Sequence, residues 1–559
     1  KKILVALVFS SAMFVWSGSS FAGGHCVGST MSDAYTGGKY PQQYELSEYE
    51  SAASCTMKFS ENPSIASINA TIQGNPGSLP PVEDRLPDEP LVIVPYESIG
   101  KYGNTINFLS NATEAGTSDM LSTRHVNLVR FADDLSTVVP NVAKDYEWND
   151  DFTTLTFMLR KGHKWSNGEP FVARDVEFWY EDLMMNPKIR EKPYPYLLVG
   201  GEPMTVDVID DQTVRFNLPS PFPGLLATLA TSYNQAFMPS HFLEQFHPEI
   251  DSNADANAQA LGFADGWDAL AAYYGNSGWT DTPTPLLRNP ELVDGLPYAA
   301  YPSLEAYMTI EDTTEGRVYA ANPYFFQVDT AGNQLPYIDY QNERYINENE
   351  IRLLKLVNGE VDYKSQSVQL ESAPQLLDGA ESGGYNIQIN PGCGAALFSF
   401  NVTHPDLEKR KVYGDIRFRQ AMSIALDRNE INDVAYYGMG VVEQFTGMSP
   451  APDFVREDMK MYMTQYDPDG AKALLDEVGL KDVDGDGFRE LPNGEPFAMN
   501  IDYATQGIGG VEVELVARMW NDVGVKTSFK EVTPDEYRGS QSSNALDVHA
   551  WDKGQPLAI

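Results

Sequence analysis

The sequence predicts an α/β protein of more than one domain, and three observations support this prediction. The chain has 559 residues, more than one simple hydrophobic core usually organises, so we expect two or three domains. Hydrophobic residues make up 42% of the chain, which is enough to fill a sizeable core. Amphipathic helical segments alternate with short strands over most of its length, and this alternation is typical of α/β architecture.

The first residues have the pattern of an export signal. Lys1 and Lys2 supply positive charge before an apolar run over 3–16, which is too short to span a bilayer comfortably. Residues 20–22 are Ser-Phe-Ala, the small-x-small pattern of a signal-peptidase site. We therefore expect 1–22 to be the signal peptide of a periplasmic protein, with an anchoring helix as the alternative.

The chain has three cysteines, Cys26, Cys55 and Cys393. An exported protein can form disulfides, and a bond between Cys26 and Cys55 would contribute about 3–4 kcal/mol. The alternative is that all three are free thiols, because three cysteines define no framework. We expect no lipid anchor, because His25 rather than a small residue precedes Cys26.

Acidic residues outnumber basic ones by a wide margin. The chain has 79 Asp and Glu against 39 Lys and Arg, for a net charge of −40. Such a surface repels nucleic-acid phosphates and anionic membrane surfaces. We therefore exclude nucleic acid as a partner.

Residues 23–90 are rich in Ser, Asn, Gly and Pro and have few periodic apolar stretches. The stretch 75–81 has the composition of a linker. We expect 23–90 to be a loosely ordered N-terminal extension before the main body of the protein.

A strand, a turn, a helix and a second strand are the clearest local pattern. Residues 154–160 and 212–218 alternate apolar and polar side chains, as half-buried strands do. Asn167-Gly168 is a tight-turn dipeptide, and 173–185 has helical spacing of its apolar residues. Charges of both signs flank this turn, and the two alternatives are pairing across it and a solvated face: Arg160, Lys161, Lys164, Asp175 and Glu177.

The rest of the chain continues the alternation. Residues 219–345 are aromatic and turn-rich, with several short helices expected. The later predicted elements are a helix then a strand over 351–372, a strand over 397–401, and helices over 416–435, 467–478 and 511–523.

Four stretches resemble one known family, in its order along the chain. They are VPNVAKDYEW from Val139 with FMLRKGHKWSNGEPFVARDVEF from Phe157, NQLPYID at 333–339 with 356–362, DIRFRQAMSIALDRNEI at 415–431, and YDPDGAKALLDEVGL at 466–480. The family is the extracellular solute-binding proteins, family 5, which includes the oligopeptide-, dipeptide- and nickel-binding proteins of ABC importers. The resemblance covers roughly 91–552, and long ordered matches are far more specific than short motifs.

The resemblance implies a large two-lobed periplasmic-binding-protein fold with an extra subdomain in lobe I. It places lobe I at 91–345 and lobe II at 346–559, and it implies hinge closure on a ligand held between them. It also implies a monomer that delivers its solute to the ABC permease, with no enzymatic activity and no required cofactor. Family members continue past the segment around Trp551, so we expect the C-terminal part of lobe II to be missing.

Three segments match the family positions that line the cleft. The first contains Glu114, which we expect to meet a ligand cation, and the second contains Gly394 and Ala395, where small residues let backbone approach a ligand. In the third, the expected ligand-binding residues are His549, Trp551 and Asp552, with Trp551 as an aromatic wall.

The ligand class is open between two alternatives. Peptide-binding members place an Asp three residues after the Trp to hold the ligand's amino group, and this chain has Gly554 there. Those peptide-binding members that have a Cys near 393 pair it with a second Cys beside the Trp, and this chain lacks that second Cys. We favour oligopeptides from family frequency, with oligosaccharides as the alternative, and rank a secreted glycan-active enzyme below both.

Asp482, Asp484 and Asp486 have the spacing of the first ligands of an EF-hand loop. Position twelve of that loop is Asn493 instead of the bidentate Glu, so we expect at most weak calcium binding, with a plain turn as the alternative. Catalytic motifs are missing: the chain has no G-x-S-x-G elbow, P-loop or HExxH.

Overall fold

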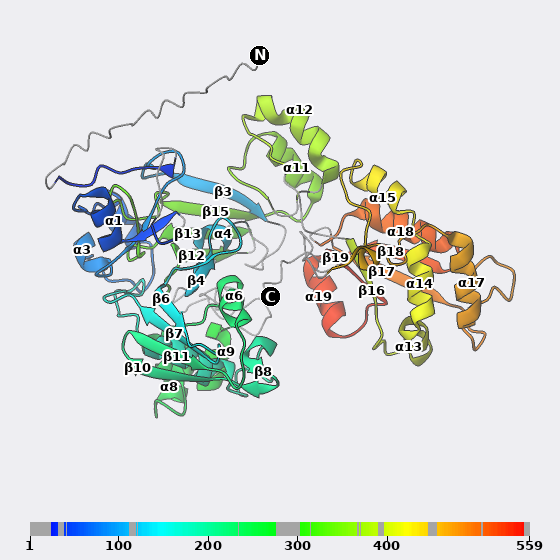
Figure 1. The fold of residues 1–559 in the computed structure, drawn as a ribbon, viewed down its shortest axis with the longest axis horizontal. Helices are drawn as coiled ribbons and strands as arrows, with labels where there is room; N and C mark the ends of the chain where they lie inside the picture. The colour runs from blue at the N-terminus through cyan, green and yellow to red at the C-terminus, as the bar shows by residue number, and fades with distance from the viewer. Residues whose placement is uncertain are drawn as a thin grey trace, which may run out of the picture.

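The computed structural model describes residues 24–31, 38–40, 42–110, 119, 121–232, 234–274, 302–313, 315–365, 368, 370–389, 396–444, 455–504 and 507–552. The chain forms two α/β lobes, which lie apart in Figure 1. The first lobe is built from 24–346 and the second from 396–552, and their hydrophobic cores share no residue. Among the described residues, no helix has both the length and the apolarity needed to cross a membrane.

The first lobe contains three main sheets. One has the order β12-β13-β15-β3, with β3 joined in parallel and the rest antiparallel. Its strands are β3 (Thr105–Ser110), β12 (Tyr307–Thr313), β13 (Gly316–Ala321) and β15 (Tyr340–Tyr345). A smaller sheet has the order β1-β2-β14 and consists of β1 (Gln43–Glu45), β2 (Leu91–Ile93) and β14 (Gln327–Asp329).

The third sheet of this lobe carries the strand–turn–helix–strand pattern predicted from the sequence. It has the order β10-β11-β7-β6 and consists of β6 (Ala143–Trp148), β7 (Thr154–Leu159), β10 (Thr205–Asp210) and β11 (Thr213–Asn217). The predicted helix begins as α5 (Ala173–Glu177) and continues as a π-helical segment, Phe178–Met184. Trp179 and Leu183 on that segment are fully buried, so the predicted apolar stripe faces the core.

Short helices and strand pairs complete the first lobe. They are α4 (Leu121–Arg124), β4 (Val129–Phe131), β5 (Val138–Pro140), β8 (Leu198–Val199), β9 (Glu202–Pro203), α6 (Gly224–Thr231), α7 (Ser240–Leu243), α8 (Ala254–Ala260) and α9 (Gly266–Tyr274). The short helices expected between 219 and 345 are therefore present in the described part of that range.

The expectation that 23–90 is loosely ordered is wrong for its described residues. This segment forms β1, α1 (Leu46–Ala53), α2 (Ile65–Asn69) and α3 (Val82–Arg85), and a disulfide joins Cys26 to Cys55. Tyr44 and Tyr49 are buried in a small core shared with Val328, and β1 pairs with β2. This segment has few apolar residues, but residues far away in the sequence cover them. The composition of the segment alone gives no sign of these distant contacts.

The basic residues at the turn contact this N-terminal segment instead of Asp175 and Glu177. Arg160, whose side chain is buried, donates to both carboxylate oxygens of Glu45 at 2.6 and 2.9 Å. Lys161 pairs with Asp88 at 3.0 Å, and the Lys164 ammonium donates to the Asp84 carbonyl at 2.8 Å. The predicted pairing across the turn is therefore wrong, and the charges fasten the N-terminal segment to the sheet.

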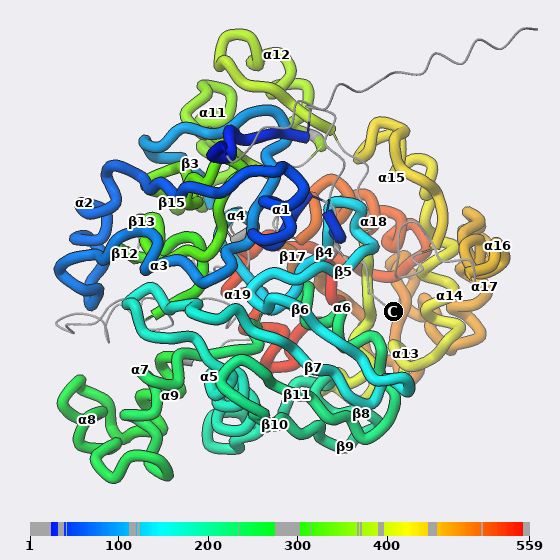
Figure 2. The backbone as a smooth tube through the Cα atoms, turned by 60° about the vertical axis from the view of Figure 1, so that its left-hand side comes forward, coloured from blue at the N-terminus to red at the C-terminus, as the bar shows by residue number. Residues whose placement is uncertain are grey.

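The segment between the lobes consists of α11 (Asn349–Val357) and α12 (Ala373–Gly383). The strand expected after α11 is absent from the described residues up to 365. Asp362 instead accepts from the backbone N–H of Asn107 in β3 at 2.7 Å, and the Lys364 ammonium lies 2.8 Å from Asp119. Figure 2 likewise shows α11 and α12 next to β3, so this segment rests against the first lobe.

The second lobe has four described strands, β16 (Ala396–Phe400), β17 (Ala498–Tyr503), β18 (Lys526–Glu531) and β19 (Val548–Asp552). β16 pairs antiparallel with β19, and β17 pairs parallel with β18. Around them pack α13 (Leu407–Gly414), α14 (Ile416–Ile424), α15 (Arg428–Ala435), α16 (Glu457–Lys460), α17 (Pro468–Val478), α18 (Gly510–Asp522) and α19 (Pro534–Ser542). The predicted strand over 397–401 and the helices over 467–478 and 511–523 are confirmed.

The single helix predicted over 416–435 is wrong, because the structure has two helices there. α14 ends at Ile424 and α15 begins at Arg428. Between them Asp427 caps the second helix, accepting from the N–H groups of Asn429 and Glu430 at 3.1 Å each. An N-cap residue has extended backbone angles, so capping at Asp427 interrupts the helix even though the apolar periodicity continues.

Candidate functional site

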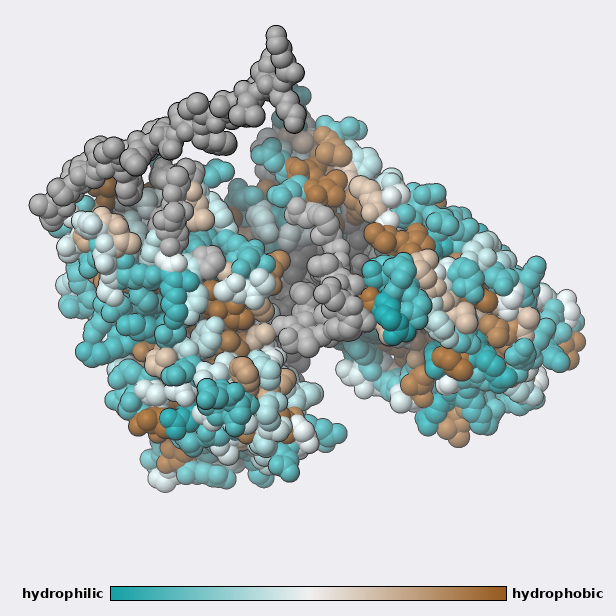
Figure 3. Space-filling model, in the orientation of Figure 1, coloured by the Kyte–Doolittle hydropathy of each residue, from teal (hydrophilic) through white to brown (hydrophobic). Residues whose placement is uncertain are grey.

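The two faces of β19 have different surroundings. Val548 and Ala550 are fully buried in the core of the second lobe. Side chains alternate along a strand, so His549 and Trp551 face the other way, opposite Ser399 and Leu397 of β16 respectively. Figure 1 places β19 and α19 on the side of the second lobe that faces the first. In Figure 3 the lower parts of the two lobes are separated by an open gap.

Trp551 is held by three groups from two other elements. The ring of Tyr537 on α19 lies 4.9 Å from it, centroid to centroid, and the guanidinium of Arg538 lies over it at 4.6 Å. Gly507 approaches so closely that a Cβ added there would overlap the indole. Only glycine therefore permits this contact of backbone with the ring.

His549 is bonded to the same helix. Its Nδ1 lies 2.8 Å from the hydroxyl of Tyr537, and that hydroxyl also donates to the Ala550 carbonyl at 3.3 Å. Burial raises the pKa of Tyr537, so its hydroxyl stays protonated. This bond ties the imidazole to α19, whichever of the two groups carries the shared proton.

Asp547 fixes the start of β19. Its carboxylate accepts from the Lys409 ammonium at 2.9 Å, the Tyr413 hydroxyl at 2.9 Å and the Asn500 backbone N–H at 3.0 Å, and it lies 3.2 Å from His404 Nε2. These contacts come from α13, β17 and the loop after β16. They hold the strand in register with its neighbours, so they also determine where His549 and Trp551 lie.

Three of the six ligand-binding residues predicted from the sequence can be placed. The structure brings His549 and Trp551 together on one face of β19, and the backbone of Asp552 pairs with Ala396 at the end of that strand. Three further predicted residues lie outside the described part of the chain: Glu114, Gly394 and Ala395.

Sequence reasoning missed three residues of this site, Gly507, Tyr537 and Arg538. Tyr537 and Arg538 lie on α19, which packs beside the strand, and Gly507 lies just before α18. An aromatic residue and an arginine side by side on a short helix give no local signal of a binding site. Only the contact with Trp551 identifies them.

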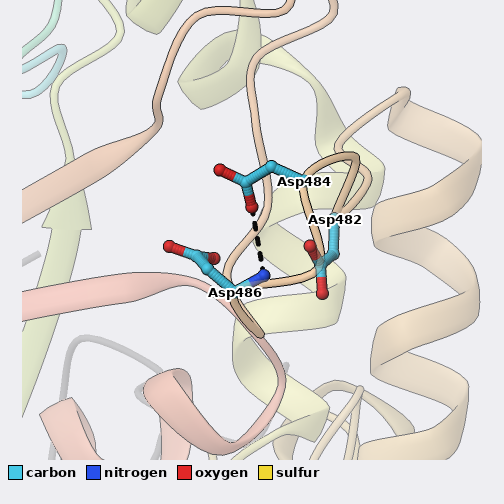
Figure 4. Close-up of side chains that lie close together, drawn as sticks. All are labelled: Asp482, Asp484 and Asp486. Carbon is cyan, nitrogen blue, oxygen red and sulfur yellow. Dashed lines mark hydrogen bonds between the residues drawn. The ribbon is translucent and has the colours of Figure 1, made fainter.

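The acidic loop predicted to bind calcium forms a tight cluster. Asp482, Asp484 and Asp486 each offer a carboxylate oxygen, and these atoms lie within 4.8 Å of one another (Figure 4). All three side chains are exposed. A set of three oxygen ligands is chemically suited to calcium, which in proteins takes six to eight.

The same carboxylates also bond to the loop's own backbone. Asp482 accepts from the N–H groups of Gly485 and Gly487 at 2.7 and 3.1 Å, and Asp484 accepts from that of Asp486 at 3.0 Å. These bonds account for the turn without an ion. Calcium binding therefore stays a prediction.

Comparison with known sequences gives a consistent result. The family model of the bacterial extracellular solute-binding proteins, family 5 (middle region), matches residues 137–555. The periplasmic alpha-galactoside-binding protein of Rhizobium meliloti is 28% identical over 494 residues, covering 81% of this chain and 63% of that protein. The dipeptide-binding protein of Escherichia coli is 25% identical over 467 residues, covering 80% of this chain and 74% of that protein. The chain thus spans less than two thirds of the length of the alpha-galactoside-binding protein.

Solved structures share the two-lobed fold. The oligopeptide-binding protein OppA has 29% sequence identity and a TM-score of 0.56, with coverage of 92% of this chain and 78% of the other. The periplasmic binding protein MelB of Agrobacterium fabrum, solved in complex with stachyose, has a TM-score of 0.67 and 24% identity. It covers 89% of this chain and 74% of its own, and at this identity the likeness describes the fold alone.

Proposed function

We propose, from the premise that this chain belongs to the bacterial extracellular solute-binding proteins of family 5, that it is the substrate-binding component of an ABC importer. It captures a solute between its two lobes outside the cytoplasm and presents the closed form to a membrane permease. The ATPase that drives transport resides on separate chains. The protein acts as a monomer and has no part in nucleic-acid binding.

The observation that carries this proposal is the aromatic wall at Trp551. The ring lies on the face of β19 opposite to the main core of the second lobe, where it packs against the small buried cluster of Ala504, Val532, Tyr537 and Leu546. The strand itself lies on the side of its lobe that faces the first lobe (Figure 1). A ligand stacked on this wall and touching the first lobe contacts both lobes at once only when they are closed. Closure follows because the ligand binds the closed state more tightly than the open state.

The ligand we propose is an oligomeric solute, either an oligopeptide or an oligosaccharide. The dipeptide-binding relative and the OppA likeness support the first class. The alpha-galactoside-binding relative supports the second. Both kinds of ligand offer several units in a row, so that one ligand molecule can contact both lobes at once.

We further propose that the ligand leaves chemically unchanged. The named side chains near Trp551 are Tyr537, Arg538 and His549, and among these the phenol and imidazole are already bonded to each other. The wall therefore supplies contact surface and hydrogen bonds, which are what a binding site needs.

Calorimetry with the intact chain tests the proposal. We expect stachyose or trialanine to bind, and Trp551→Ala to weaken that binding by at least about tenfold, because a stacking aromatic contributes on the order of 1–3 kcal/mol at a binding site. The control is Trp148→Ala on β6 in the first lobe, where the indole packs on Phe152. We expect the control to keep the affinity of the unaltered protein. Absence of binding by both ligands at millimolar concentration, or release of a cleaved product, contradicts the proposal.

A further inference from the structure

Resting on the proposed solute-binding function, we infer that Lys364 is a positioning residue for ligand capture. Its ion pair with Asp119 fastens the linker unit, residues 346–385 with α11 and α12, to the first lobe. Closure on a ligand then moves the second lobe relative to the linker unit and the first lobe together. The expectation from the sequence began the second lobe at residue 346, whereas this inference leaves the linker unit with the first lobe.

The ion pair of Lys364 and Asp119 is buried. The side chain of Lys364 is 5% exposed and that of Asp119 is fully buried, and the ammonium nitrogen lies 2.8 Å from a carboxylate oxygen. The backbone N–H and the hydroxyl of Ser365 donate to the other carboxylate oxygen at 3.0 and 2.8 Å. Loss of one partner of a buried pair leaves an uncompensated charge, so this contact resists separation far more than an exposed pair does.

The two residues before Lys364 also contact the first lobe. Asp362 accepts from the backbone N–H of Asn107 in β3 at 2.7 Å and from its side-chain amide at 3.0 Å. The backbone N–H of Asp362 in turn donates to the Asn107 carbonyl at 3.0 Å. The ring of Tyr363 lies edge-on to that of Phe108, with centroids 6.3 Å apart. A rotation of the linker unit away from β3 would therefore break several contacts at once.

The linker unit is tied together internally. The buried guanidinium of Arg352 on α11 donates to the carbonyls of Ile346 and Asn347 at 2.7 and 2.8 Å, just after β15 ends. A Cβ added to Gly359, which follows α11, would lie 2.0 Å from the carbonyl oxygen of Gly383 at the end of α12. The two helices thus meet backbone to backbone, as only glycine permits. A force that holds Lys364 therefore holds both helices.

The described part of the linker unit has no comparable ties to the second lobe. No hydrogen bond, ion pair or ring contact joins its described residues to those of 396–552. Burial lowers the pKa of Arg352, and the charge of Glu531 at the end of β18 opposes this shift from a distance. Such a long-range field constrains orientation far less than direct bonds do. The contacts between described residues therefore fasten the linker unit on one side only.

Spin labels on the linker unit test which lobe it follows. Leu377 on α12 is 56% exposed and can be labelled as cysteine in a Cys393→Ser background, together with Leu135 of the first lobe or Val483 of the second. Pulsed electron paramagnetic resonance gives each distance with and without saturating stachyose or trialanine. We expect the 377–135 distribution to stay unchanged and the 377–483 distribution to shift when a ligand binds.

A variant of the ion pair tests the role of Lys364 itself. We expect Lys364→Ala to broaden the 377–135 distribution without ligand and to weaken ligand binding at least about threefold, because closure must then also order the linker unit. Lys364→Arg keeps the charge and should restore the narrow distribution. The matched control is Lys355→Ala on α11, because that ammonium pairs at 2.7 Å with Glu360 of the same unit and should change neither quantity.

Circular dichroism melting curves establish that each variant is folded, since a purely structural role would lower the melting temperature without broadening the distribution. If Lys364→Ala does not fold, the double variant Asp119→Asn with Lys364→Gln removes the ion pair without stranding a charge and should broaden the distribution in the same way.

The outcomes distinguish failure of this inference from failure of the proposed function. If a bound ligand shifts the 377–135 distribution, or if Lys364→Ala behaves like Lys355→Ala, the inference is wrong while solute binding stands. If a bound ligand leaves the 377–483 distribution unchanged, closure and with it the proposed mechanism fall. If neither ligand binds, the proposed function fails, and the ligand-free comparison of the two lysine variants still decides whether Lys364 holds the linker unit.

Discussion

The two lobes differ in what they bury. Among the described residues, the first lobe buries many charged side chains, including Arg85, Arg124, Arg160, Asp175, Glu305, Arg317 and Glu343. The described part of the second lobe buries only Thr464, Glu512 and Thr527 among its polar and charged residues. A buried charge that loses its partner strongly lowers the stability of the fold, whereas the stability of an apolar core depends mainly on the volume of its side chains. The first lobe therefore depends on specific buried ion pairs, whereas the described part of the second lobe is held together mainly by apolar packing.

Removing one partner of a buried ion pair in the first lobe should have the largest effect on stability. The carboxylate of Glu305 is fully buried, pairs with Arg124, and also accepts from Gln235 at 3.2 Å. We expect Glu305→Ala to lower the free energy of unfolding by about 3–5 kcal/mol, because it leaves the Arg124 guanidinium uncompensated. Urea unfolding followed by circular dichroism measures this loss.

The control for that experiment is an exposed pair in the second lobe. Glu408 pairs with Lys411 at 2.6 Å, and the Lys411 side chain is 72% exposed. We expect Glu408→Ala to change stability by less than about 0.5 kcal/mol. Equal effects of the two substitutions would remove the distinction between the lobes.

Acid should destabilise the first lobe through His163. This imidazole lies between Phe171 and Phe326, and neither ring nitrogen has a hydrogen-bond partner among the described residues. Burial, with the nearby charges of Arg160 and Lys164, lowers the pKa of His163 from its ordinary 6.5 to about 3. The unfolded chain therefore binds a proton that the folded chain rejects, and stability falls as the pH drops below 6.5 toward 3.

Replacing that imidazole with an apolar ring should remove this acid sensitivity. Between pH 7 and pH 4, we expect the free energy of unfolding of His163→Phe to fall by roughly 2–3 kcal/mol less than that of the unaltered chain. Urea unfolding at pH 7, 5 and 4 measures how the free energy of unfolding of each protein depends on pH. If the two proteins show the same dependence on pH, another group accounts for the acid lability of the first lobe.

The smallest effect expected is the loss of a helix cap in the second lobe. Asp427→Ala removes the acceptor for the first N–H groups of α15 and should cost about 1 kcal/mol. Asp433 is an exposed acid on the same helix, and Asp433→Ala should change stability by less than about 0.5 kcal/mol. Thermal unfolding of both variants provides the comparison. A larger loss from Asp433→Ala would show that capping is not what divides α14 from α15.

The elements predictable from the sequence are those whose limits are set by their own residues. α17 begins after Asp467, which accepts from the Gly470 N–H at 2.8 Å, and ends before Gly479 at φ 95°. These capping signals are visible in the sequence. The N-terminal segment is different because its partners are remote: Glu45 is held by Arg160, and Arg85 donates to the Pro323 carbonyl.

In the candidate site, too, some features follow from the sequence and others depend on contacts between distant residues. The resemblance to the family names His549 and Trp551, without a predicted strand at that point, and the structure places both on one face of β19. The contacts of Tyr537 and Arg538 with Trp551 arise from how α19 packs against β19. No periodicity or motif encodes that packing, so these residues become visible only in three dimensions.

The distance between the lobes, with and without ligand, tests the central claim most directly. Leu135 in the first lobe and Val483 in the second are 81% and 75% exposed, so each can be replaced by cysteine and spin-labelled in a Cys393→Ser background. Pulsed electron paramagnetic resonance then gives the distance between the two labels. We expect this distribution to become narrower and to change its mean when a ligand binds, because the ligand favours the closed form. A bound ligand that leaves the distribution unchanged would contradict capture by closure of the two lobes.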